Sequence, residues 1–228
     1  MSVYLLMAIV MGISGFVMAF GVIGHKKLPA RFKLHDKANP KVMQGKALYM
    51  NVIPNSMVST LMLFTWVFLF EDIMFYAAAA PVWRIVVESV AVLLLYDFLY
   101  YLLHRYPFHE WPTLKRVHAV HHRGKYPTAH DSIYLHPVEG ILGVLLFNLC
   151  VLSTAAIGGI SVWSYAVIFF FYTQLNIIVH WGLELKTFPL NIITYMSKKH
   201  DRHHKSMREG NYASITPLPD WLFGTLVE

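Results

Sequence analysis

Residues 140–183 read GILGVLLFNLCVLSTAAIGGISVWSYAVIFFFYTQLNIIVHWGL, and none of them is Asp, Glu, Lys or Arg. Coiled as one α-helix at 1.5 Å per residue, this stretch would be about 66 Å long, roughly twice the ~30 Å hydrocarbon core of a bilayer. We therefore expect two membrane passes, joined by a turn near Gly158 and Gly159.

Three more apolar stretches precede this one, at residues 3–24, 50–70 and 85–103. The first has no basic segment before it and is longer than the apolar part of a secretory signal, so we expect an uncleaved membrane anchor. The other two are interrupted by Pro54 and Asp97. The sequence thus predicts four or five membrane spans.

The composition agrees with a polytopic membrane protein. Hydrophobic residues make up 56% of the 228 residues and charged residues only 14%, whereas a soluble domain carries about 25% charged residues. We expect a single integral-membrane domain over residues 1–228. The only cysteine, Cys150, lies in an apolar run, so no disulfide framework is expected.

The positive charges are distributed unevenly, although the net charge is +6. Of the 19 Lys and Arg residues, 18 fall in residues 24–49, 104–137 and 184–228. The positive-inside rule places such segments in the cytoplasm. This rule accounts for the basic charge without a nucleic-acid partner, and it puts the histidine-rich segments on the cytoplasmic side.

The pattern His-x-x-His-His occurs twice, as HAVHH at 118–122 and HDRHH at 200–204. On a helix, positions i, i+3 and i+4 share one face, so the three histidines of each triplet can converge. Neutral imidazoles crowded together need something that shares their nitrogens, and a metal ion does this. The predicted ligands from this pattern are His118, His121, His122, His200, His203 and His204.

Other histidines lie close to these segments. His104 ends the third span, and His109 follows after Pro107, which should break the helix and return His109 to the cluster. His180 lies near the end of the last span, and Glu184 shares its helical face as a further ligand or a hydrogen-bond partner. His25 and His35, in the first basic segment, are expected to be ordinary polar loop residues.

The number of histidines indicates two metal ions. Tetrahedral zinc takes four ligands, so nine histidines fit two ions with four or five nitrogens each. Imidazole binds iron, zinc, copper and nickel, so the ligands do not identify the metal.

Acidic and polar residues can orient metal-bound imidazoles by accepting their second N–H. Asp97 is the leading candidate, because it lies seven residues before His104 on nearly the same helical face. Lower-ranked or alternative structural candidates are Asp131, His136, Glu139, Asn211 and Asp220. Aromatic residues near the spans are interpreted mainly as membrane packing, with a lipid tunnel as the alternative: Tyr96, Phe98, Tyr100, Tyr101, Phe169, Phe170, Phe171 and Tyr172.

The sequence resembles the fatty acid hydroxylase and sterol desaturase superfamily of membrane di-iron oxidases. The resemblance covers residues of about 90–228. It is carried by DFLYYLLHRYPFH (97–109), HAVHH (118–122), HPVEG (136–140), HWGLE (180–184), HDRHH (200–204) and NYASITPLPDWLFGT (211–225).

The apolar spans and the charge distribution predict an all-α bundle with a cytoplasmic histidine-rich cap, and the resemblance adds the chemistry. It implies two iron ions, although zinc or another metal can occupy such sites, and O2 as co-substrate. A lipid would be hydroxylated or desaturated with electrons from ferredoxin, cytochrome b5 or a similar reductase system. The first histidine box has the four-residue spacing of the fatty acid 2-hydroxylase branch, but Glu184 stands where that branch has a histidine. The implied ligands are His104, His109, His118, His121, His122, His180, His200, His203 and His204.

Two other functions use similar residues. A metal or haem transporter would place its site near the membrane midplane on broken helices, whereas these histidines lie in polar segments outside the spans. An oxygen-independent zinc enzyme is a third possibility. The position of the histidines favours the oxidase.

Overall fold

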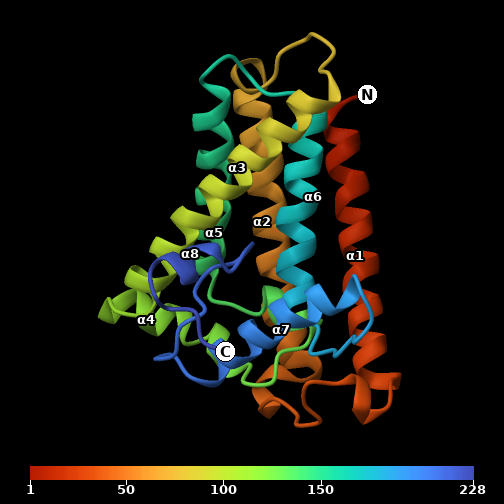
Figure 1. Cartoon of the computed structure of the whole chain (residues 1–228), viewed down its shortest axis with the longest axis vertical. Helices are drawn as coiled ribbons and strands as arrows, with labels where there is room; N and C mark the ends of the chain where they lie inside the picture. Colours follow the sequence, from red (N-terminus) through yellow and green to blue (C-terminus); the bar gives the residue numbers. More distant parts are fainter.

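The computed structural model describes all 228 residues and contains five long helices that form an upright bundle (Figure 1). All five are apolar and long enough to cross a membrane. The prediction of an all-helical membrane bundle is confirmed, with the higher of the two predicted span counts. The long helices are α1 (Val3–Lys27), α2 (Gly45–Met74), α3 (Val82–Leu103), α5 (Pro137–Ala155) and α6 (Val162–Val179).

The long uncharged stretch divides where the sequence predicts. Between α5 and α6, Gly158 and Gly159 have φ angles of +116° and +76°, a backbone region that glycine enters without steric cost. A Cβ on Gly159 would lie 3.1 Å from the backbone nitrogen of Tyr76. The two glycines therefore allow the chain to reverse against the α2–α3 connection.

The five long helices form an incomplete ring. Helix α1 packs on α6, α6 on α3, α3 on α5, and α5 on α2, whereas contact between α1 and α2 is sparse. The interior contains fully buried side chains such as Val67, Phe147 and Tyr165. Interior packing thus holds the helices in the order α1–α6–α3–α5–α2, with a gap between the two outer members.

The remaining elements are short and form a cap at the end of the bundle opposite the N-terminus (Figure 1). The three basic segments therefore lie at one end, as the charge distribution predicts, and Arg84 begins α3 at the other end. The cap contains η1 (Ala30–Phe32), η2 (Lys41–Met43), η3 (His104–Phe108), α4 (Pro112–His118), η4 (His121–Arg123), η5 (Ala129–Ile133), α7 (Leu190–Lys205) and α8 (Leu218–Leu222).

Helix α3 enters the cap through a wider, π-helical turn. This turn, η3, contains Pro107, which the sequence predicts to break the helix. Proline cannot donate the regular helical hydrogen bond, and π-helical turns are frequent at functional sites. The helix ends directly after this turn, and both His104 and His109 face the same cluster of histidines.

The segment after α7 folds back over the cap and is fixed by two buried carboxylates. Asp97 of α3 accepts hydrogen bonds from the backbone N–H groups of residues 214–216 at 2.8–3.1 Å and from the hydroxyl of Thr216 at 2.6 Å. Asp220 accepts from the N–H groups of Tyr212 and Ala213, each at 2.8 Å. These bonds hold residues 212–216 beside the end of α3.

Candidate metal centre

The nine predicted histidines meet in the cap and form two groups. Within each group, the nitrogen atoms that face each other all lie within 4.8 Å. Eight of the nine residues are buried, and His200 is partly buried. The five-histidine group contains His104, His109, His118, His122 and His203, and the four-histidine group contains His121, His180, His200 and His204.

The two His-x-x-His-His triplets cross between the groups. Each triplet contributes its first and last histidine to one group and its middle histidine to the other. Spacing predicts that each triplet shares one face but does not predict this division. In the first triplet, α4 ends at His118 and the chain tightens into the 3₁₀ turn η4, so His121 and His122 do not continue the α-helical face.

The Nε2 atoms of four residues in the five-histidine group form a closed ring with four nearly equal sides. The side from His104 to His118 and the side from His118 to His122 are each 3.0 Å, and the two sides that meet at His203 are each 3.1 Å. Nitrogens about 2.1 Å from one metal ion, at right angles to each other, would be about 3.0 Å apart. The separations of 3.0–3.1 Å between these nitrogens therefore fit a metal site.

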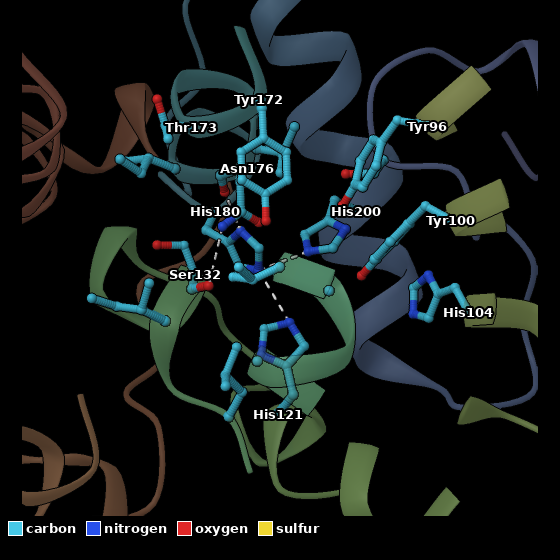
Figure 2. Close-up of a pocket in the computed structure, with 18 of the residues that line it drawn as sticks. Tyr96, Tyr100, His104, His121, Ser132, Tyr172, Thr173, Asn176, His180 and His200 are labelled. Atoms are coloured by element: carbon cyan, nitrogen blue, oxygen red, sulfur yellow. Dashed lines mark hydrogen bonds between the residues drawn. The ribbon is translucent and has the colours of Figure 1, made fainter. Parts of the chain in front are cut away.

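The four-histidine group has similar separations between its Nε2 atoms. They are 3.3 Å from His121 to His180, 2.8 Å from His180 to His200, and 3.0 Å from His200 to His204. Figure 2 shows His121, His180 and His200 converging from three segments of the chain. Both groups can thus hold an ion through Nε2 atoms.

Hydrogen bonds fix the protonation pattern of most of these rings. Six of them place Nδ1 at 2.7–3.0 Å from an oxygen. In five of the six this oxygen is a main-chain carbonyl, which can only accept, so Nδ1 donates and Nε2 keeps a lone pair. Lone pairs facing each other at about 3 Å repel unless a cation lies between them. The donor and acceptor pairs are His104 with Tyr212, His109 with Met207, His118 with Glu139, His121 with Tyr134, His180 with Asn176, and His203 with Gly210.

Burial keeps these histidines neutral. Desolvation lowers the pKa of His118 to about 3, and together with neighbouring histidines it lowers the pKa values of His109 and His180 to about 3. At neutral pH the nitrogens are therefore free of the extra proton that would prevent metal binding. The donor set and its protonation state both fit two bound metal ions.

Glu139, and not Asp97, accepts a hydrogen bond from one of these histidines. Its Oε1 lies 2.8 Å from Nδ1 of His118, and both side chains are buried. The predicted ranking of the two acids was therefore wrong, because Asp97 is fully engaged with residues 214–216. Asp97 supports the site indirectly, because residues 214–216 begin two positions after Tyr212, whose carbonyl oxygen accepts from His104.

Three other predicted residues lie outside both groups. Glu184 forms an ion pair with Lys198 at 2.6 Å. His136 caps the N-terminus of α5 by accepting from the N–H of Val138. Asn211, in the left-handed conformation with φ +63°, binds the carbonyl oxygens of Lys199 and Val227 and supports the folded-back segment.

Of the two histidines predicted to be loop residues, His25 is placed differently, whereas His35 lies in a loop. His25 lies in the last turn of α1, and its ring packs 5.2 Å from that of His35. His35 forms a hydrogen bond with the carbonyl oxygen of Pro127 at 3.1 Å. Both residues help to join α1 to the cap.

Backbone carbonyls are the acceptors that sequence reasoning missed. Five of the six oxygens that receive an Nδ1 proton belong to the main chain. A main-chain carbonyl has the same chemistry at every position, so no residue type indicates it. Glu139, by contrast, has a signal in the sequence, because it lies in the motif HPVEG at residues 136–140.

An internal cavity of about 420 Å³ extends from the histidines into the bundle. At the cap end it is lined by His104, His121, His180 and His200, and deeper by residues from all five long helices. Figure 2 shows Tyr96, Tyr100 and Tyr172 beside these histidines. Of the eight aromatic residues interpreted mainly as packing, Tyr96, Tyr100, Phe169 and Tyr172 line the cavity.

A second cleft opens on the outer face of the cap. Its lining includes His122 and His204, one from each histidine group, and the exposed basic residues Arg123, Lys125 and Lys205. The rings of His122 and His204 are stacked, with centroids 4.9 Å apart. The cleft thus connects the basic surface with both groups.

Comparison with known proteins agrees with this arrangement. Very-long-chain aldehyde decarbonylase GL1-11 of Oryza sativa subsp. indica is 32% identical over 153 residues, which cover 64% of this chain and 54% of that protein. Methylsterol monooxygenase 2-1 of Arabidopsis thaliana is 27% identical over 218 residues, covering 86% of this chain and 77% of that protein. The chain spans about half the length of the aldehyde decarbonylases that it matches.

No solved structure matches the chain. The sequence model of the fatty acid hydroxylase family matches residues 89–225, which include all nine clustered histidines, Glu139 and the folded-back segment. The chain therefore belongs to the fatty acid hydroxylase family, within the fatty acid hydroxylase and sterol desaturase superfamily that its histidine motifs resemble.

Proposed function

We propose that this protein is a membrane oxidoreductase that uses O2 and two iron ions to hydroxylate or desaturate a C–H bond of a lipid. The observation that carries the proposal is the cavity that leads from the apolar interior of the bundle to histidines of both groups. The relatives support a lipid substrate, since their names describe oxidation of methylsterols and reaction of very-long-chain aldehydes.

The proposed iron ligands are the nine clustered histidines. Bound iron supplies the oxidising power, with O2, that an aliphatic C–H bond requires. Soluble di-iron bundles use mainly carboxylates with Glu-x-x-His pairs, whereas here the facing atoms are all imidazole nitrogens. Glu139, an acid near the site, does not face the other ligand atoms but accepts a hydrogen bond from Nδ1 of His118.

The protein itself positions the rings and keeps water away. Main-chain oxygens and Glu139 hold the Nδ1 protons, so each of these rings keeps one orientation. Phe169 and the paired rings of Tyr96 and Tyr172, whose centroids are 5.2 Å apart, line the cavity. A lipid that fills this space excludes water from the reacting carbon.

Electrons would arrive at the basic cleft. Arg123, Lys125 and Lys205 form a positive rim, and the cleft reaches the ligand rings of both groups. Such a surface attracts a small acidic electron carrier of the ferredoxin or cytochrome b5 type. By the positive-inside rule, the cap and this cleft face the cytoplasm, where such carriers are found.

The test uses the protein purified in detergent and expressed in cells. We expect about two iron ions per chain, and mass spectrometry of cellular lipids under heavy-isotope oxygen should show one labelled oxygen atom, or the loss of two hydrogens without label. The variant His121→Ala should abolish the new lipid, and His130→Ala, which removes a histidine outside both groups, should not. Unchanged lipids with iron-loaded wild-type protein would refute the proposed activity.

A further inference from the structure

The ring of membrane helices is open at one side. Each neighbouring pair in the order α1–α6–α3–α5–α2 packs extensively, whereas contact between α1 and α2 is sparse. The 420 Å³ cavity lies inside this ring and is lined by all five helices. The gap between α1 and α2 is therefore the side on which no helix pair closes the cavity.

Both helices at the gap present one face to the cavity. The lining residues of each follow the spacing i, i+3, i+4 and i+7, which is a single stripe along a helix. These residues are Met11, Ser14, Gly15 and Met18 of α1, and Ser56, Ser59, Thr60 and Leu63 of α2. Most of them are small, and Gly15 is exposed.

The gap is framed above and below. Towards the N-terminal end of α1, the hydroxyl of Tyr4 donates to Glu71 at 2.7 Å, and the ring of Tyr4 stacks on that of Phe64. Towards the cap, the turn η5 packs against both α1 and α2. What remains is a mouth in the middle of the helices, where a membrane protein faces lipid chains.

The depth of the mouth follows from helix geometry. Gly15 lies twelve residues after the start of α1 at Val3, a rise of about 18 Å. This places the mouth near the middle of the ~30 Å hydrocarbon core. It therefore opens to acyl chains and not to the aqueous phase.

The walls of the mouth suit an uncharged occupant. The hydroxyls of Ser14 and Ser56 donate to carbonyl oxygens of their own helices, at 2.9 and 2.8 Å. No lining residue of α1 or α2 is charged. A Cβ added to Gly15 would have no atom within 4 Å, so the space beside it is open.

We propose that the substrate is an uncharged lipid that enters sideways from the bilayer, between α1 and α2, through the mouth bordered by Gly15 and Thr60. The proposal rests on the proposed lipid oxidation and names its access route. A charged headgroup would be costly to move through the hydrocarbon layer at this depth. Both helices precede residue 89, where the family match begins, so this route depends on a part of the chain that the match does not cover.

The experiment follows a lipid into the cavity without requiring turnover. The whole protein is placed in phosphatidylcholine vesicles that contain a long-chain fatty alcohol with a diazirine in the middle of its chain. After irradiation, mass spectrometry of peptides should find label on the inner residues Phe169 and Tyr172 of α6. In Gly15→Phe and in Thr60→Phe, which narrow the mouth from opposite sides, this inner label should fall at least about fivefold.

Matched controls lie on the same two helices. Gly12, like Gly15, has open space beside it, but it does not line the cavity, and Leu61 is 68% exposed on the outer face of α2. In Gly12→Phe and Leu61→Phe, the inner label should equal that of the wild type. Metal content and melting temperature show whether each variant is folded. If Gly15→Phe does not fold, Gly15→Leu provides a milder substitution at the same position.

Two results would overturn the proposed route. The first is inner labelling that is unchanged in folded Gly15→Phe or Gly15→Leu and in Thr60→Phe. The second is an equal loss of label in the controls. If the label follows the predicted pattern but no lipid is oxidised, the mouth stands and the proposed oxidation fails, so the two proposals are separately testable.

Discussion

Replacing Glu139 by alanine tests how the protein holds one metal site. The carboxylate of Glu139 is the only side-chain group that accepts a proton from a clustered histidine, at 2.8 Å from Nδ1 of His118. His118 is completely buried, and Glu139 is nearly so. In Glu139→Ala, the buried N–H of His118 loses its acceptor, and the ring loses the contact that fixes its orientation.

The size of the effect follows from this loss. Leaving a buried donor without a partner costs about 1–3 kcal/mol, which corresponds to roughly a 5- to 150-fold weaker binding constant. Partners of metal-bound histidines typically contribute 10- to 100-fold in affinity. The expected loss is therefore about one to two powers of ten, and it acts first on the five-histidine group, because the hydrogen bond of Glu139 to a clustered histidine is the one with His118.

The assay is a competition with a chelator, followed by metal analysis. As chelator concentration rises, Glu139→Ala should pass through a state with about one ion per chain, because one group releases its ion at least about tenfold earlier. Glu139→Gln keeps an acceptor oxygen and should lie much closer to the wild type. Metal retention equal to the wild type in Glu139→Ala would refute the reasoning, as would earlier release from the four-histidine group.

Three further predictions concern pH, substrate length and electron transfer. Burial lowers the pKa of His118 to about 3 from its ordinary value of 6.5, so the unfolded chain binds protons first as the pH falls. The metal-free protein should have its full stability above pH 6.5 and lose stability as the pH falls towards 3. The loss should be up to about 1.4 kcal/mol per pH unit for each such histidine. Thermal unfolding at several pH values checks this, and a melting temperature that does not change with pH contradicts it. Phe169→Ala should deepen the cavity and shift product formation towards longer lipids, at a cost of about 3 kcal/mol in stability; an unchanged product profile across a chain-length series would exclude Phe169 as the limiting wall. Arg123→Glu combined with Lys125→Glu should slow reduction by an acidic carrier by about tenfold at low salt, an effect that added salt removes, while reduction by dithionite stays as in the wild type; equal slowing with dithionite would show damage to the site itself.

Much of the fold is present in the sequence because the membrane restricts what each segment can do. An uncharged stretch of residues 140–183 is too long for one pass, so two helices and a glycine turn follow from length alone. The uneven distribution of Lys and Arg likewise predicts that the histidine-rich segments meet at one end of the bundle. Neither inference needs knowledge of tertiary contacts.

The details of the site depend on such contacts, and there sequence reasoning fails in specific ways. Helical spacing brings the members of a triplet together, but the docking of η4 against α7 decides that His121 joins His200 while His122 joins His203. Asp97 lies on nearly the same helical face as His104, which Glu139 does not. Its carboxylate nevertheless accepts hydrogen bonds from the folded-back segment and not from a histidine. Glu139 lies seventeen residues after His122, the last histidine of the first triplet. Only the folding of α5 brings its carboxylate within hydrogen-bond distance of His118.

The folded-back segment also has a consequence for the order of events during synthesis. Met207, Gly210 and Tyr212, whose carbonyl oxygens orient three rings of the five-histidine group, all come after the ninth clustered histidine in the chain. A growing polypeptide therefore contains all nine clustered histidines before it contains the carbonyl oxygens that orient three of them. Stable capture of an ion by this group must wait until the ribosome has added this segment and the segment has docked on Asp97.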